Sequence, residues 1–214
     1  MIRPELDESL RADLASCSAL LGILFLRKPE ADDAQAVIGE LRCASMREWP
    51  FGSEADLADV EELVCGLSYE DEPSFIEALS HDYQRLFIGP FALAAPPWGS
   101  VYLDYESVIC GCSTVKLQDW MRTHGLTVAN DRNEPEDHIG LMFMLLSWLS
   151  SNRPELISDY LEKHFCTWAP HFCDLMQEKA QTPFYQGVAA LARITLESIE
   201  EGLGLNVVEP KFYR

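Results

Sequence analysis

The sequence has few basic residues for its length and therefore little means of binding phosphate. It contains 16 Lys and Arg residues against 35 Asp and Glu residues, which gives a formal net charge of −19 over 214 residues. Proteins bind nucleic acids mainly through Lys and Arg with release of counterions, so this composition argues against DNA and RNA as partners. An anionic membrane surface is disfavoured for the same reason. The charge favours neutral or positively charged partners.

A long apolar run and a secretory leader are also missing. The longest apolar stretch, Leu20–Leu26, is much shorter than the roughly 20 residues that span a bilayer. Met1–Arg11 carries three acidic residues and no apolar run, whereas a secretory signal begins with a basic segment. We therefore expect no insertion into a membrane and no secretion.

Cysteines are present in an odd number and without a disulfide framework. Their scatter at helical positions is typical of reduced thiols that pack as small apolar side chains in a reducing compartment. The pair Cys110 and Cys112 lacks the two-residue gap of a redox or zinc motif. The predicted location is the cytoplasm. The seven residues are Cys17, Cys43, Cys65, Cys110, Cys112, Cys166 and Cys173.

Motifs for nucleotide, covalent and metal chemistry are missing as well. The sequence contains no phosphate-binding G-x-x-x-x-G-K-[ST] loop, no dinucleotide-binding G-x-G-x-x-G and no G-x-S-x-G nucleophile elbow. His164-x-Cys166 and His171-x-Cys173 offer four metal ligands within ten residues. Residues two apart on a helix point about 200° from each other, so neither pair closes on one ion. We expect no cofactor and no metal.

Helical periodicity runs through almost the whole chain. Apolar residues recur every three or four positions from Leu6 to Leu24, where Lys28-Pro29 ends the pattern, and helices are also predicted near 37–41 and 57–67. Later helices are predicted over 113–124, 139–149, 170–180 and 182–200, with another from Arg153-Pro154. No convincing pair of strands is found. The sequence predicts an all-α fold, one globular domain over residues 1–214 with about nine or ten helices.

One segment breaks this periodicity. The helix that opens at Glu72-Pro73 carries an apolar face up to Phe87, and an irregular segment then runs from Ile88 to Leu103. Within it, Gly89–Ser100 holds three prolines and two glycines but is strongly apolar. A solvated linker should be polar, so we expect this loop to lie on the body of the protein or to form the wall of a site.

The helix predicted over 139–149 is apolar nearly all round, so we expect it to be the central buried helix. A group of acidic residues precedes it, at Asn133–His138. One interpretation is capping, with Asn133 as the N-cap and Glu136 as its capping-box partner. The other is a site for a cationic ligand. Three carboxylates there could accept the paired donors of a guanidinium group, and His138 would add a group that titrates near neutral pH. With the preceding helix end and the apolar loop, they could line a groove for a peptide with apolar and cationic side chains.

Three segments together resemble the TorD/DmsD family of cytoplasmic redox-enzyme maturation chaperones. They are Tyr83–Pro90 (YQRLFIGP), Pro96–Asp104 (PPWGSVYLD) and Glu134–His138 (EPEDH). Trp120–Arg122 and Pro183–Tyr185 resemble in particular the DmsD branch, which serves dimethyl sulfoxide reductase. The likeness is clear over about residues 82–214 and loose over the first 80. The Y/W-x-x-L-F and E-P-x-D-H motifs are specific in combination.

The resemblance implies a helical chaperone without enzymatic turnover. Its expected ligand is the twin-arginine leader of a molybdoenzyme catalytic subunit, which it holds until the cofactor is inserted and so delays export. The Tat translocase and molybdenum-cofactor maturation proteins are further implied partners. Tyr83 stands where the DmsD branch is expected to carry Trp, and this difference keeps an aromatic side chain at the position. The residues predicted to bind the peptide are Tyr83, Leu86, Phe87, Pro97, Trp98, Glu134, Glu136, Asp137 and His138.

Two alternatives stay open at this point. One is a helical metal-dependent hydrolase that uses Glu136, Asp137 and His138. The other is a helical adaptor whose apolar loop docks a partner without reading arginines. Salt dependence separates the adaptor from the leader-binding protein, because apolar docking should respond little to ionic strength.

Overall fold

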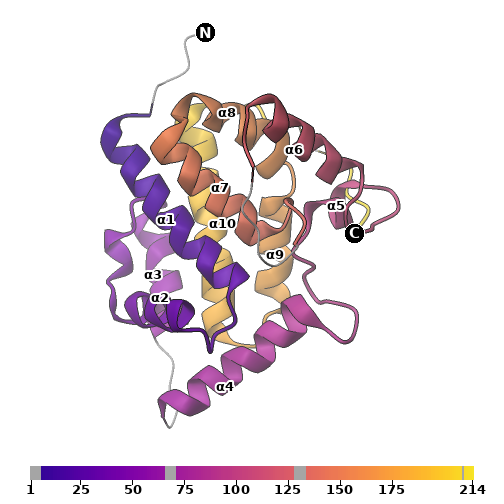
Figure 1. The fold of residues 1–214 in the computed structure, drawn as a ribbon. Coiled ribbons are helices and arrows are strands. Elements are labelled where there is room, and N and C mark those ends of the chain that lie inside the picture. Colours follow the sequence, from indigo (N-terminus) through magenta and orange to yellow (C-terminus); the bar gives the residue numbers. More distant parts are fainter. Residues whose placement is uncertain (1–5, 66–70, 128–133, 209) are drawn as a thin grey trace.

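The computed structural model describes residues 6–65, 71–127, 134–208 and 210–214. In these ranges the chain forms ten α-helices and no strand, so the predicted all-α fold is confirmed (Figure 1). Short 3-10 helices at Met46–Glu48 and Pro154–Leu156 and π-helical turns at Gln84–Ile88 and Leu161–Phe165 complete the structure. The helices are α1 (Glu8–Leu26), α2 (Asp32–Cys43), α3 (Glu54–Cys65), α4 (Glu72–Tyr83), α5 (Gly99–Leu103), α6 (Cys112–Thr123), α7 (Ile139–Asn152), α8 (Ile157–Tyr160), α9 (Ala169–Lys179) and α10 (Pro183–Leu203).

Local signals in the sequence set several helix ends. The Asp7 carboxylate accepts from the Leu10 backbone N–H at 2.8 Å and caps α1, and Asp71 caps α4 in the same way. Thr182 caps α10, whose first residue is a proline. Gly204 ends α10 in the left-handed conformation with φ of 57°, which glycine adopts without strain.

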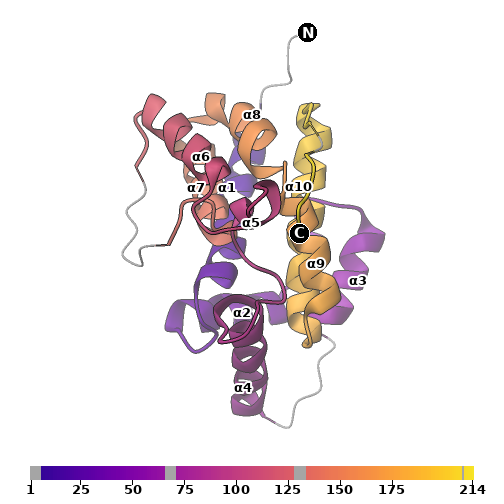
Figure 2. The ribbon, with the colours of Figure 1, turned by 90° about the vertical axis from the view of Figure 1, so that its right-hand side faces the viewer.

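The helices pack around an aromatic core. α10 lies beside α9 and against α3, and α1 packs along α7 (Figures 1 and 2). The Phe25 ring of α1 stacks on Phe143 of α7 at 5.7 Å between centroids and meets Phe172 of α9 edge-on at 5.8 Å. Such contacts between rings add to the free energy gained by burying them. The core thereby joins the first helix to the C-terminal half of the chain.

Two glycines let α1 and α7 approach closely. A Cβ atom on Gly140 would lie 2.5 Å from Leu26 Cγ and 3.0 Å from the Gly22 carbonyl oxygen. A Cβ atom on Gly22 would meet the Met144 side chain at 2.8 Å. The backbones therefore cross where both helices lack side chains.

The length and composition of α1 also satisfy a test for membrane spans. Over an 18-residue window α1 is apolar enough to cross a bilayer, although core helices pass the same test. The sequence interpretation missed this because small residues divide the apolar run without making the segment hydrophilic. Seven of its residues are buried within the fold.

Candidate functional site

The apolar loop and the acidic motif meet in a short antiparallel bridge between Trp98 and His138. The Gly99 N–H donates to the Asp137 carbonyl at 3.0 Å, and the Ile139 N–H donates to the Pro97 carbonyl at 2.7 Å. Two segments about forty residues apart in the sequence thus form one unit at the beginning of α7. The predicted convergence of these segments is confirmed.

The bridge also gives α7 a different N-cap from the one that the capping interpretation predicted. The N-cap of α7 is His138, whose Nδ1 accepts from the Gly140 N–H at 3.1 Å. The capping interpretation is therefore wrong for this helix, and Asn133 lies outside the described residues. Glu136 is not a capping-box partner, because its Oε2 accepts instead from Gln118 Nε2 of α6 at 2.7 Å. The pairing with the loop fixes the backbone of residues 137–139, so α7 begins at Ile139.

Asp137 is a buried carboxylate with one oxygen to spare. Its Oδ2 accepts from the Ser100 N–H at 2.7 Å, whereas its Oδ1 is buried without a hydrogen bond, as are the Ser100 and Thr114 hydroxyl oxygens. Burial raises the pKa of Asp137 above its ordinary value of 3.8, and the hydrogen bond from the Ser100 N–H partly offsets that effect. A buried acceptor of this kind suits a ligand that donates hydrogen bonds.

We expect Asp137→Asn to stabilise the protein at neutral pH and to lose this advantage as the pH falls. Because the folded state raises the pKa of Asp137, the carboxylate opposes folding as the pH rises from the ordinary value through the raised one, and the full penalty applies at neutral pH. Asn carries no such charge, and its amide can donate to the Ser100 or Thr114 hydroxyl. Urea unfolding across the acidic range checks this. A stability difference that does not shrink below the ordinary carboxyl pKa would contradict it.

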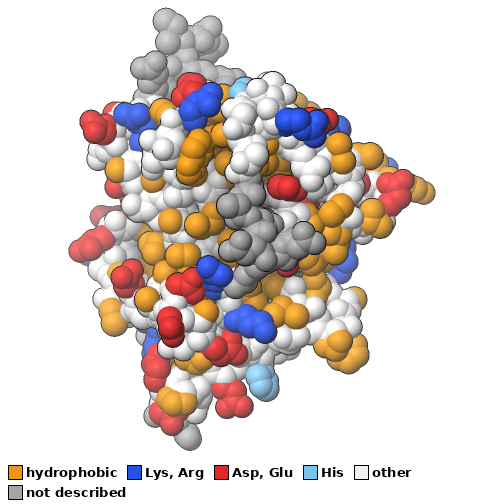
Figure 3. All heavy atoms as spheres, in the orientation of Figure 1, with side chains coloured by type: hydrophobic (Ala, Val, Ile, Leu, Met, Phe, Trp, Pro, Cys, Tyr) orange, Lys and Arg blue, Asp and Glu red, His pale blue; other side chains and the backbone are white. Residues whose placement is uncertain are grey.

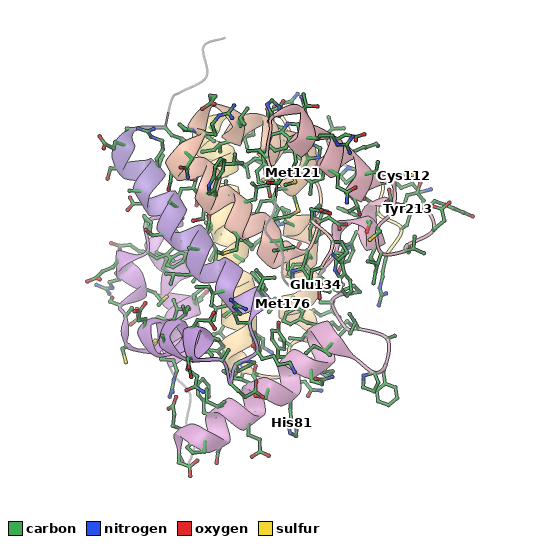
Figure 4. All side chains as sticks on the ribbon, in the orientation of Figure 1. His81, Cys112, Met121, Glu134, Met176 and Tyr213 are labelled. Atoms are coloured by element: carbon green, nitrogen blue, oxygen red, sulfur yellow. The ribbon has the colours of Figure 1, made fainter. Side chains whose placement is uncertain are left out.

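Three of the predicted residues are half-buried and reachable from solvent. These are Trp98, Glu134 and Glu136. Glu134 lies beside the beginning of α7, and its Oε2 accepts from the Trp98 indole N–H at 3.3 Å (Figure 4). The Trp98 ring in turn meets His138 edge-on at 6.0 Å. The indole, two glutamates and the buried Asp137 thus occupy one corner of the molecule, and a guanidinium group there would find carboxylate oxygens and an aromatic ring.

The other predicted residues lie deeper. Leu86 is fully buried, and Tyr83 and Phe87 are almost so. The Tyr83 hydroxyl donates to the Phe25 carbonyl near the end of α1 at 3.2 Å, and the Phe87 ring packs edge-on against Phe25. Pro97 is buried too. In this conformation these four residues are buried, so their contribution to peptide binding stays a prediction.

The two halves of the apolar loop differ in burial. Ala95 is buried, as expected for a segment that lies on the body of the protein, but Phe91 is 85% exposed. The helix before it ends in a π-helical turn at Gly89, whose φ of 97° excludes most other residues. The prediction that the loop packs on the body is therefore confirmed for its second half only.

A cavity that the sequence did not reveal adjoins Asp137. It has a volume of about 220 Å³ and reaches from Asp137 and Gly99 to two lysines, Lys116 of α6 and Lys163 of the π-helical turn. Trp168 closes one side, and its indole lies 2.7 Å from where a Cβ atom on Gly99 would be. The signal was the glycine of the P-P-W-G-S segment, which no larger residue can replace without displacing Trp168.

The seven cysteines differ in burial, and the candidate metal ligands are not grouped in the described part of the chain. Among the residues that the structure describes, all seven cysteines are free thiols. Burial raises the pKa of Cys17 to about 12, an effect that Asp13 strengthens, so this thiol is a packing residue. Cys43 is exposed, contrary to the expectation that it packs as an apolar side chain, and Cys110 and Cys112 are surface thiols. No three His, Cys, Asp or Glu side chains in the described ranges are grouped to hold a metal.

Comparison with known proteins gives one consistent family. Residues 53–174 match the model of the nitrate reductase delta subunit family. A Tat proofreading chaperone, DmsD of Salmonella typhi, is 40% identical over 94% of this chain and 97% of its own length. A DmsD-type relative from Haemophilus influenzae is 44% identical over 91% of this chain and 94% of its own length. The chaperone protein TorD of Vibrio cholerae is 28% identical over 80% of this chain and 83% of its own length.

The fold is shared with a solved structure as well. A crystal structure described as a redox enzyme maturation protein from Archaeoglobus fulgidus superposes with a TM-score of 0.58, at 24% identity, over 90% of this chain and 96% of that one. Relatives named as chaperones over nearly their whole length contradict the hydrolase alternative built on Glu136, Asp137 and His138. The chain belongs to the TorD/DmsD family of redox-enzyme maturation chaperones, which are not enzymes.

Proposed function

We propose that this chain binds the twin-arginine leader of a molybdoenzyme catalytic subunit of the dimethyl sulfoxide reductase type, in the cytoplasm, and proofreads that subunit before Tat export. The observation that carries the proposal is the corner formed by Trp98, Glu134, Glu136 and Asp137, together with relatives named as Tat proofreading chaperones. A protein of net charge −19 that presents carboxylates beside an indole ring suits a cationic peptide.

How an arginine would bind here follows from the groups that now donate hydrogen bonds to these carboxylates. Glu136 and Asp137 accept from neutral groups, a Gln118 amide and the Ser100 N–H. Hydrogen bonds from a charged donor are roughly twice as strong, so a guanidinium group that replaces or adds to a neutral donor gains free energy. The planar guanidinium can also lie on the face of the half-buried Trp98. Two adjacent arginines would thus engage different carboxylates of the same corner.

Two further partners belong to the proposal. A chaperone that holds a subunit until its molybdenum cofactor is inserted meets the maturation proteins that supply the cofactor. It then releases the subunit to the Tat translocase. Ordering a flexible leader costs entropy, so we expect moderate affinity and ready release.

An adaptor that docks its partner through the apolar loop is the second candidate, because Phe91 is 85% exposed at the tip of that loop. Its ring would give such a partner an apolar contact whose burial favours docking. The two candidates differ in their response to salt. Arginine recognition weakens as ionic strength rises, whereas loop docking changes little.

The test is a titration of a labelled leader peptide with two arginines against the same peptide with two lysines. We expect the lysine peptide, and the arginine peptide with Glu136→Gln protein, to bind about tenfold more weakly than the arginine peptide with the unaltered protein. Lysine is a point charge that cannot pair in bidentate fashion with a carboxylate.

The matched control is Glu77→Gln, which removes an exposed charge on α4, far along the chain from the corner. It should change the affinity less than twofold, because an isolated surface charge contributes little. Equal binding of the arginine and lysine peptides would refute arginine recognition. Equal losses in both variants would show that only the net charge of the protein matters.

A further inference from the structure

α7 carries apolar side chains that reach the surface of the protein. None of its fourteen residues is charged, although the helix reaches the surface of a strongly acidic protein. Met144 is 39% exposed and Trp148 is 45% exposed, and Leu141 and Leu145 are half-buried. These four residues follow at helical spacing and form one stripe along α7. We call them the α7 stripe.

The neighbouring part of α1 extends this surface. Met144 lies over Gly22 of α1, where the two helices cross. Ala15 and Ala19 precede Gly22 at helical spacing and are half-buried, and Asp13 is the only charged residue of α1 between Ala12 and Leu26. Figure 3, drawn in the orientation of Figure 1, shows hydrophobic side chains over the region of α1 and α7. Uncharged surface of this kind usually marks a binding site.

The stripe continues directly from the acidic corner. Glu134 and Glu136 precede the first turn of α7, and the stripe begins in that turn at Leu141. From Leu141 to Trp148 the helix rises by about 10 Å, which three or four extended residues would cover. The order along the surface is therefore carboxylates first and apolar side chains after them.

This order matches a twin-arginine leader, in which two arginines are followed by an apolar run. We propose that the apolar run of the leader docks on the α7 stripe while its arginines occupy the acidic corner. The inference rests on the proposed function and deepens it. Leu86, Phe87 and Pro97 are buried, whereas the stripe begins one turn after the carboxylates and carries two exposed apolar side chains, Met144 and Trp148.

The test uses two synthetic peptides that share the arginine pair. In one, the arginines precede a run of leucine and alanine, and in the other a run of serine and glycine. We expect the double variant Met144→Gln/Trp148→Gln to bind the apolar peptide about tenfold more weakly than the unaltered protein, because a large aromatic residue at such a site contributes most of the binding energy. Both proteins should bind the serine peptide with the same affinity.

Two control variants accompany this test. Val115→Gln changes an apolar residue of α6 that is 48% exposed, and it should leave both affinities unchanged within twofold. Trp148→Phe keeps an aromatic residue and should retain binding of the apolar peptide. Unchanged binding of the serine peptide by the double variant guards against a folding defect.

Three outcomes would overturn the inference. The first is an unchanged affinity of the double variant for the apolar peptide, and the second is an equal loss for both peptides. The third is a change of oligomeric state on sedimentation with unchanged peptide binding, which would assign the stripe to a second copy of the chain. Failure of the proposed function itself has a different signature, namely equal binding of arginine and lysine peptides by the unaltered protein.

Discussion

Asp82→Ala lowers the free energy of unfolding by about 3–5 kcal/mol, because it leaves several buried donors without an acceptor. Asp82 is 2% exposed near the end of α4. Its Oδ2 accepts from the Gln181 N–H, the Thr182 N–H and the Thr182 hydroxyl at 2.8–2.9 Å, and its Oδ1 accepts from Arg85 at 2.7 Å. One carboxylate therefore fixes the start of α10 to α4. Chemical denaturation followed by circular dichroism measures the loss.

The chain offers a closely matched control for this prediction. Asp119 pairs with Arg122 at the same i, i+3 spacing at 2.9 Å, but its side chain is 60% exposed. Exposed ion pairs contribute little, so Asp119→Ala should change stability by less than about 0.5 kcal/mol. If the two variants lost similar amounts, the ion pair rather than the burial of Asp82 would be responsible. Asp82→Asn, which keeps one accepting oxygen, should lose less than Asp82→Ala.

The helices and their order follow from periodicity and local caps, and so were accessible from the sequence. Apolar spacing located α1, α4, α7 and α10 to within a few residues, and Pro73 and Pro183 lie in the first turns that they were expected to open. These signals are local, since a cap or a periodic face is set within one or two turns. They fail where a contact distant in sequence takes over.

The N-cap of α7 is such a failure. Asn133 and Glu136 form a good capping box by residue type, but the Trp98–His138 bridge and the Gln118 amide compete for the same segment. Pairing with a loop about forty residues away cannot be seen in a local pattern. The same holds for the α4–α10 tie, although Asp82 did leave a sign, as a charged residue on the face that carries Leu79 and Leu86.

The candidate site was predictable in part. The sequence brought the acidic motif and the P-P-W-G-S loop together correctly. Leu86 and Phe87, which it assigned to a peptide groove, are buried in this conformation, so their part in binding stays a prediction. An apolar face on a helix shows that residues are buried without showing what buries them. The exposed stripe on α7 went unrecognised for the converse reason. A helix that is apolar nearly all round was expected to be central, and the structure leaves Met144 and Trp148 at the surface.

Gly140→Ala is expected to destabilise the protein by about 2–3 kcal/mol, although alanine favours helices over glycine. The added Cβ atom would lie 2.5 Å from Leu26 Cγ and 3.0 Å from the Gly22 carbonyl oxygen. The leucine could shift, but the backbone oxygen belongs to a helix that packs along α7. The two helices must therefore separate, with loss of contacts around Phe25 and Phe143.

Gly39→Ala on α2 is the control that isolates this crossing. No atom lies within 4 Å of a Cβ added at Gly39, so alanine there should stabilise the protein by about 0.5–1 kcal/mol through helix propensity. Opposite signs from the same substitution would show that packing, not propensity, decides the choice of glycine at Gly140. A neutral result for Gly140→Ala would mean that α1 moves freely on α7. Because the α7 stripe borders that crossing, a destabilised crossing should also weaken the binding of an apolar leader more than that of a serine-rich one.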